Sequence, residues 1–567
     1  MNKNTGYSIC LLLTLFLWFL STANGAPGDL DTTFSLDGKS FEPIGIGGSD
    51  IVRGTAIQSD GKIVVAGPVH FGTTYSCGVA RYNSDGTFDT LFDGDGKTVV
   101  QINSRFECVA VAIQSDGKIV IAGQVYGTNL DFAVVRLNSD GSPDVTFDGD
   151  GKMTTPVLSG DDSTFALAIQ PDGKIVVAGQ SYAANLDFAV IRVNTDGSLD
   201  TSFDTDGKVT TAISSYEDLG RAVAIQADGK IIIAGYSFTG TNYDFVLVRY
   251  NTNGSLDTSF DGDGKAITGV LSSTDQAYAV KLQADGKIIA AGYTYNGSNI
   301  DFALVRYNTN GSLDTSFDFD GKVITPVLTS TDQINALSIQ PDGKIVAAGQ
   351  SRNGTYYDFA LVRYNTNGSL DTSFDTDGKL TTLIAVSSDE VKGVAVQPDG
   401  KIVAAGYTNP GIGADYNLIR YNADGSVDTT YGTAGRVTFD IRGASSDLLY
   451  GMALDSTGRA VAVGDANGLF TIVRLLGDTA PRSVNYSLSG RVEINEKGIR
   501  NVLVYLTDAT GITRITRTNS FGYYQFNEVT PGTCIITIES KRYFFENPTR
   551  TINLSENISD IYFRTIE

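Results

Sequence analysis

The chain has 567 residues, of which 63 are Gly and only one is His, and its formal net charge at pH 7 is −22. Most of the negative charge comes from Asp in turn-like segments, which favours solubility and argues against nucleic acid or an anionic membrane surface as a partner. Many glycines together with abundant Tyr, Phe, Val, Ile and Thr are typical of short strands joined by tight turns. We therefore expect an all-β protein.

Residues 1–25 have the pattern of a secretory signal peptide. Lys3 supplies the positive charge, Leu11 to Leu20 form an apolar run, and Ala23-Asn24-Gly25 is a small-residue cleavage site. The run is too short for a spanning helix, and no other apolar stretch of spanning length follows it, which disfavours a retained anchor. The sequence predicts a secreted or cell-surface protein without a membrane span in the mature chain.

A repeated unit fills the chain from Leu30 to Arg474. Each copy reads LDxxFDxDGK, then AIQxDGKIVVAG, then DFAxVRYNxDG. A fixed long period is the mark of a repeat architecture. The glycine of the central Asp-Gly-Lys recurs eight times, at Gly61, Gly117, Gly173, Gly229, Gly286, Gly343, Gly400 and Gly458.

Four strands are predicted within one unit. In residues 198–250 they are Lys208 to Ile213, Arg221 to Gln226, Lys230 to Gly235 and Asp244 to Tyr250. An Asp-Gly pair separates the second and third by two residues, which indicates a hairpin. The third segment is apolar without alternation and ends in a recurring glycine. It is therefore expected to be a central strand whose glycine marks a close backbone approach or a bulge.

Four strands in each of eight units predict an eight-bladed β-propeller, with an open β-solenoid as the alternative. The chain begins with one outer-strand segment, Lys39 to Ile44, but its last unit ends after a fourth segment of the DFAxVR type, Phe470 to Leu475. We expect this N-terminal strand to complete the last blade; simple packing of separate blades is the other way to close the ring.

These units resemble the delta-60 repeat family of bacterial secreted proteins over residues 28 to 477. The resemblance implies a propeller-like fold and almost nothing about biochemistry.

Two polar residues recur in every unit, an arginine of the fourth segment and the aspartate of LDxxF. Strand alternation places the arginine on a partly buried face, where it needs an anionic partner, and the aspartate is the natural candidate. A structural ion pair is favoured over a pocket of eight arginines. The arginines are Arg81, Arg136, Arg192, Arg249, Arg306, Arg363, Arg420 and Arg474, and the aspartates are Asp31, Asp89, Asp144, Asp200, Asp257, Asp314, Asp371 and Asp428.

A second set of aspartates lies eight residues before the Gln of AIQ or its equivalent. We expect these residues to form a ring on one rim of the propeller and to cap turns there. The set is Asp50, Asp162, Asp218, Asp275, Asp332, Asp389 and Asp447, with Phe106 as the exception.

Calcium binding is an alternative role for the acidic turns. The segment Asn194 to Lys208 contains NxDGxxD followed by DxDG, and acidic oxygens around a glycine suit a hard cation. The segment lacks the opening Asp and closing Glu of an EF-hand loop, so ordinary Asp-Gly turns also explain the pattern. No other cofactor is expected. The candidate ligands are Asp140, Asp144, Asp148, Asp150, Asp196, Asp200, Asp204 and Asp206.

Three cysteines, Cys77, Cys108 and Cys534, follow the signal peptide. Their odd number and wide spacing do not form a disulfide framework. A bridge between adjacent blades is one option, but the sequence favours buried small hydrophobic residues for all three.

The repeat stops at residue 477, and residues 478–484 are predicted to be a linker. Residues 485–567 form a succession of alternating strands that predicts a small β-sandwich. Gly490-Arg491-Val492, the segment Gly522 to Phe526, and Pro531-Gly532 resemble the carboxypeptidase regulatory-like, transthyretin-like domain. The usual aromatic after Pro-Gly-x is here Cys534. The predicted organisation is thus signal peptide 1–25, propeller 26–477, linker 478–484 and sandwich 485–567.

Two classes of function fit this organisation. The favoured class is a secreted, non-catalytic scaffold or binding protein, acting in surface adhesion or in recognition of an extracellular protein or glycan. The alternative is an extracellular propeller enzyme, a polysaccharide hydrolase or lyase, which would need repeat-breaking polar residues that converge on one rim. Such residues are spread over several units, so no catalytic residue is predicted; they are Glu42, His70, Arg105, Glu107, Glu217 and Glu390.

Overall fold

The structure is a computed structural model. It describes residues 26–46, 50–71, 74–103, 105–409, 413–441, 446–477, 486–495, 497–507, 513–529, 532–540, 542–554 and 558–565. The predicted signal peptide and the predicted linker lie outside these residues. The described chain consists of strands and turns and divides into two compact units. Within it, no helix is long and apolar enough to cross a membrane.

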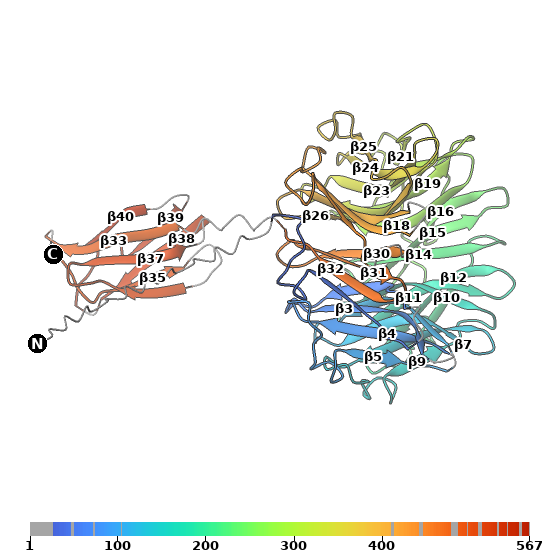
Figure 1. Cartoon of the computed structure of the whole chain (residues 1–567), viewed down its shortest axis with the longest axis horizontal. Helices are drawn as coiled ribbons and strands as arrows, with labels where there is room; N and C mark the ends of the chain where they lie inside the picture. Colours follow the sequence, from blue (N-terminus) through green and yellow to red (C-terminus); the bar gives the residue numbers. More distant parts are fainter. Residues whose placement is uncertain are drawn as a thin grey trace, which may run out of the picture. The chain divides into compact units, whose positions relative to one another are not determined.

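The first unit is a propeller of eight four-stranded antiparallel sheets, counted over the described residues (Figure 1). The innermost strands of successive sheets contact one another in a closed series, and the last contacts the first. The ring is therefore closed, and the open solenoid does not form. The inner strands of blades 1 to 8 are, in order, β2 Gly54–Ile57, β6 Phe106–Ile113, β10 Asp162–Ile169, β14 Asp218–Ile225, β18 Asp275–Leu282, β22 Asp332–Ile339, β26 Ser388–Val396 and β30 Asp447–Leu454.

The other strands follow outward from the axis. The second strands are β3 Ile63–Phe71, β7 Ile119–Tyr126, β11 Ile175–Tyr182, β15 Ile231–Phe238, β19 Ile288–Tyr295, β23 Ile345–Arg352, β27 Ile402–Asn409 and β31 Ala460–Ala466. The third strands are β4 Thr74–Tyr82, β8 Leu130–Leu137, β12 Leu186–Val193, β16 Tyr243–Tyr250, β20 Ile300–Tyr307, β24 Tyr357–Tyr364, β28 Asp415–Tyr421 and β32 Phe470–Arg474. The outer strands are β5 Lys97–Val100, β9 Lys152–Thr155, β13 Lys208–Thr211, β17 Lys265–Thr268, β21 Lys322–Thr325, β25 Lys379–Thr382, β29 Arg436–Phe439 and, in blade 8, β1 Lys39–Glu42.

The N-terminal strand closes the propeller. Strand β1 pairs antiparallel with β32, from Lys39 opposite Val473 to Glu42 opposite Phe470. Figure 1 shows the orange strands β30 to β32 beside the blue strands of blade 1. Blade 8 is thus built from both ends of the propeller sequence, as the position of the unpaired N-terminal segment predicts.

The Asp-Gly turns set the hairpins between inner and second strands. In blade 4 the Gln226 N–H donates to the Lys230 carbonyl, and the Gly229 N–H donates to the Gln226 carbonyl, both at 2.9 Å. Gly229 has φ of 83°, a conformation that glycine adopts without a steric penalty. The turn therefore contains three residues, Ala227 to Gly229, and not the two that the Asp-Gly pair predicts. Only Gly229 takes positive φ, which is typical of a three-residue turn that ends in a bulge.

The recurring glycine of the second strand faces a bulge of the inner strand. The β14–β15 register shifts between Gly220 and Ala222, opposite Gly235. A Cβ on Gly235 would lie 1.9 Å from the Leu219 carbonyl oxygen, so only glycine fits. The same bulge explains why β14 begins at Asp218 and not at Arg221, since the extra residue interrupts the alternation that marks a strand.

The hydrophobic core lies between the blades. Second and third strands are buried on both faces, and the apolar side chains of one blade pack on those of the next. Between blades 3 and 4, for example, Val176 and Val190 pack with Ile231 and Val246, and Phe203 completes the cluster. Central strands covered on both sides are what the unbroken apolar run predicts.

One cysteine prediction is wrong. Cys77 of β4 and Cys108 of β6 form a disulfide that joins blades 1 and 2. The two positions are 31 residues apart in sequence, but packing of adjacent blades brings their Cα atoms to 5.6 Å, within bridging distance. Cys534 is buried in the core of the second unit, as expected.

The second unit is a sandwich of two four-stranded sheets. One sheet has the order β34-β33-β37 with β40 parallel to β33, and the other has the order β36-β35-β38-β39. Its core includes Leu488, Val504, Phe526, Ile536 and Phe563. The strands are β33 Tyr486–Ile494, β34 Lys497–Gly498, β35 Leu503–Thr507, β36 Thr513–Arg517, β37 Tyr523–Val529, β38 Gly532–Glu539, β39 Thr549–Leu554 and β40 Ile558–Arg564.

Removal of residues 26–46 tests the closure. The deletion exposes the edge of β32 and takes Asp31 away from Arg474, so we expect a lower melting temperature and association between exposed edges. Thermal melting and size-exclusion chromatography measure both effects against a chain that begins at Ala26. An unchanged melting temperature in a monomer would contradict the closure.

Candidate functional site

The recurring arginines and aspartates come together within the propeller. In each of the eight blades the arginine Nε lies 2.6 to 2.9 Å from an Oδ2 of the aspartate, and both side chains are buried. Seven of these pairs are local, since the aspartate follows its arginine by eight residues. The eighth joins Arg474 to Asp31 and so links the two ends of the propeller.

Six of the arginines also donate through Nη1 to a backbone carbonyl of the neighbouring blade; they are Arg81, Arg192, Arg249, Arg306, Arg363 and Arg474. The Arg249 guanidinium lies over the Phe260 ring at 4.5 Å and donates through Nη1 to the Thr309 carbonyl of blade 5. The carboxylate of Asp257 is also paired with a partly buried lysine, since Lys230 Nζ lies 2.8 Å from Asp257 Oδ2. Burial disfavours the charged form of Asp257, but the bonds from Lys230, Ser259 and Arg249 outweigh it and hold the pKa of this carboxyl well below its ordinary value. Each of these groups is therefore engaged by other groups of the propeller, in agreement with the expected ion pair.

The aspartates nominated for calcium cap their own turns. Asp140 and Asp196 each accept a serine N–H at 3.0 Å and the same serine hydroxyl at 2.6 Å. Asp150 and Asp206 accept the N–H of the following lysine. Asp144 and Asp200 belong to the arginine pairs, while Asp148 and Asp204 occupy left-handed turn positions. Six of these eight carboxylates thus accept hydrogen bonds from donors of the protein itself; they are Asp140, Asp144, Asp150, Asp196, Asp200 and Asp206.

The second set of aspartates forms a buried ring. Asp332, for example, accepts the Val327 N–H at 2.7 Å through Oδ2 and the Ser351 hydroxyl through Oδ1. Burial raises the pKa of Asp332 to about 6, against these hydrogen bonds. The carboxylate caps the connection from the preceding outer strand, which is the role that its position predicts.

The two ends of the blades differ in sequence variation. One end carries the QxDGK turns between inner and second strands, which are nearly identical in the first seven units; the eighth reads Asp455-Ser456-Thr457-Gly458-Arg459. The opposite end carries the beginnings of the inner strands and the turns between second and third strands, and here the residues vary. We call this end the variable face. The repeat-breaking residues that looked scattered in sequence all lie at this end: Glu42, His70, Arg105, Glu107, Glu217 and Glu390.

A cleft opens on the variable face across blades 2 to 4. It has a volume of about 800 Å³, in the range of small-ligand sites. Four aromatic side chains line it, Tyr182, Tyr216, Phe238 and Tyr243, together with the carboxylates of Asp161 and Glu217. Tyr182 and Tyr216 are 46% and 49% exposed, so each offers a ring to a ligand. We call it the aromatic cleft.

The cleft residues are held in place by contacts among themselves. The Phe238 ring meets Tyr216 edge-on at 5.3 Å and Tyr243 at 5.2 Å. The Tyr243 hydroxyl donates to Glu217 at 3.0 Å, and the Asn185 amide donates to the Tyr216 carbonyl. The rings are therefore positioned without a ligand, which lowers the entropic cost of binding.

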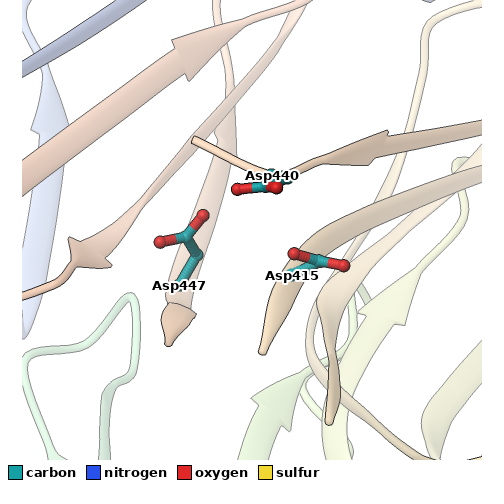
Figure 2. A group of neighbouring side chains, drawn as sticks. All are labelled: Asp415, Asp440 and Asp447. Carbon is teal, nitrogen blue, oxygen red and sulfur yellow. The ribbon is translucent and has the colours of Figure 1, made fainter. Parts of the chain in front are cut away.

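Three carboxylates gather elsewhere on the variable face. Asp415, Asp440 and Asp447 turn toward one another (Figure 2), and they are the one group in the described chain with three acidic or metal-ligating side chains within 4.8 Å. The Ile441 N–H already donates to Asp447 Oδ2 at 2.6 Å. Burial, together with the charges of Asp440 and Asp447, raises the pKa of Asp415.

Seven stretches of the chain match a protein-family model described as "Domain of unknown function (DUF5122) beta-propeller": 58–92, 114–147, 170–203, 226–260, 283–317, 340–374 and 397–431. Residues 485–563 match the "BOS complex subunit NOMO1-like, second beta sandwich domain". Both descriptions agree with the two units of the structure. No curated protein matches the sequence.

Several solved structures are similar to the chain at low identity. Sqt1 from Chaetomium thermophilum shares 13% identity with a TM-score of 0.46, over 78% of this chain and 99% of its own. An ulvan lyase of polysaccharide lyase family PL25 shares 12% with a TM-score of 0.37, over 77% and 95%. The periplasmic gluconolactonase PpgL of Pseudomonas aeruginosa shares 12% with a TM-score of 0.36, over 70% and 98%. Likenesses this weak carry no information on the function of this chain.

Of the cleft residues, only Glu217 stands among the outliers that the sequence singles out. The aromatic residues could have been found by aligning the units on the ring aspartate. Two residues before it stand Gly160, Ser273, Ser330 and Ser387 in other units, but Tyr216 in this one. An aromatic side chain at a position that is otherwise small is the departure that marks the site.

The substitution Arg249→Met tests the structural role of the arginine. It leaves Asp257 buried without its guanidinium, so we expect a loss of about 3 kcal/mol in the free energy of unfolding, measured by urea titration. Lys230→Met is the matched control, because Lys230 contacts the same carboxylate from a more exposed position and should cost less than about 1 kcal/mol. Equal losses from the two substitutions would contradict this assignment.

Calcium binding at the acidic turns stays a prediction, and Asp196→Asn tests it. Asn253 caps the equivalent turn of the next unit with the same two bonds, at 3.1 and 2.7 Å, so a capping role predicts a change in stability below about 0.5 kcal/mol. Titration calorimetry of calcium against magnesium then gives the same heats for both chains. A calcium-specific heat that falls in the variant would show that the turn binds the ion.

Proposed function

We propose that the chain is a secreted, non-catalytic scaffold that binds an extracellular protein or glycan through the variable face of its propeller. The observation that carries the proposal is the contrast between the two ends of the blades: one end repeats, and the other holds the preformed aromatic cleft. Binding residues commonly lie on loops that a rigid scaffold positions. The C-terminal sandwich would serve as a spacer.

Three features support secretion as part of this proposal. The first 25 residues have the pattern of a signal peptide. The Cys77–Cys108 disulfide suits an oxidising compartment, because the cytosol keeps thiols reduced. The resemblances to delta-60 repeat proteins and to carboxypeptidase regulatory-like domains point to extracellular relatives.

An extracellular polysaccharide hydrolase is the second candidate, favoured by one observation. Asp161 and Glu217 both line the aromatic cleft, and glycoside hydrolysis generally requires a pair of carboxyl groups. Both groups already accept hydrogen bonds within the protein, Asp161 from the Leu130 N–H at 2.9 Å and Glu217 from the Tyr243 hydroxyl. This arrangement suits fixed hydrogen-bond acceptors better than groups that exchange protons with a substrate.

A combined glycan and protein array with the chain from Ala26 onward tests the binding proposal. We expect retention of at least one ligand class and no release of new reducing ends from any polysaccharide that binds. If reducing ends appear and Glu217→Gln abolishes them while the melting temperature is unchanged, the hydrolase is the correct candidate. An array without a ligand of either class would contradict the binding proposal.

A further inference from the structure

The aromatic cleft has the chemistry of a carbohydrate subsite. The axial C–H groups of a pyranose ring present an apolar face that packs on an aromatic ring. The surrounding hydroxyls form hydrogen bonds with carboxylate and amide side chains. Tyr182 and Tyr216 provide half-exposed rings on two adjacent blades. Glu217, Asp161 and Asn185 stand beside them as hydrogen-bonding groups.

The charge of the cleft restricts which sugars it can take. Among the residues that the structure describes, its lining includes two carboxylates and no lysine or arginine. The whole chain has a net charge of −22. A uronate or a sulfate ester would be repelled, whereas the hydroxyls of a neutral sugar donate to carboxylates. The cleft therefore selects against anionic polysaccharides.

We propose that the aromatic cleft binds a neutral polysaccharide segment, with Tyr216 and Tyr182 as stacking platforms and Glu217 and Asp161 as acceptors of sugar hydroxyls. This inference rests on the proposed binding function and specifies its ligand. A basic peptide, whose cationic groups could also face the two carboxylates, is the main competing occupant. The half-exposed rings favour the sugar, because they lie open for stacking against the apolar faces of sugar rings.

Calorimetric titration with neutral hexasaccharides tests the proposal, using cello-, laminari-, manno- and xylo-hexaose, with an oligogalacturonate as the anionic probe. We expect at least one neutral hexaose to bind and the oligogalacturonate not to bind. Tyr216→Ala should then weaken the binding by about tenfold or more, because the stacking surface is lost.

Tyr295→Ala is the matched control. Tyr295 occupies in blade 5 the repeat position of Tyr182, is 37% exposed and lies outside the cleft, so its loss should leave the affinity unchanged. Thermal melting of both variants checks that they fold. Equal affinities of Tyr216→Ala and the wild-type chain, or binding of the anionic probe alone, would overturn the proposal.

The outcome separates this inference from the proposed function. If none of the neutral sugars binds but the array retains a basic peptide or another protein, the propeller is a binding scaffold and the carbohydrate assignment is wrong. If neither the array nor the sugar panel gives a ligand, the binding function itself fails.

Discussion

The buried arginine of the third strand is the contact on which the propeller depends. Its guanidinium is neutralised by an aspartate of the same blade, lies over an aromatic ring and donates to a backbone carbonyl of the next blade. A buried cation without these partners would be strongly destabilising. The folding of one blade is therefore coupled to its packing against the next blade. The pairing with aspartate repeats in all eight blades and the bond to the next blade in six of them, and the ring closes after eight units.

Closure uses the same contact over a much longer stretch of chain. Arg474 and Asp31 are 443 residues apart, whereas the other pairs are eight residues apart. The entropic cost of closing a loop grows only with the logarithm of its length, so the pair and the β1–β32 ladder suffice to hold the ends together. The Cys77–Cys108 disulfide joins the first two blades covalently.

Features repeated along the chain could be predicted from sequence, and features produced by contact between different units could not. The number of blades, the covered second strand and the closing N-terminal strand follow from the spacing and polarity of the units. The disulfide did not follow, because Cys77 and Cys108 approach only through packing of adjacent blades. The start of β14 at Asp218 was missed because the bulge at Gly220 breaks the alternation. The aromatic cleft was missed because its rings come from two blades, and each ring alone looks like an ordinary strand residue.

A ring of equal units offers eight equal surfaces, so a specific site must lie where one unit departs from the others. In blades 3 to 7 the ring aspartate accepts a hydroxyl from Ser181, Ser237, Thr294, Ser351 or Thr408. Blade 8 has Ala466 at that position, opposite Asp447, and brings Asp440 close to it. That departure removes a hydrogen-bond donor and gathers like charges. The departure at Tyr216 instead adds an exposed aromatic ring, and the neighbouring Phe238 ring holds it in place. For this reason we assign ligand binding to the aromatic cleft and not to the acidic group.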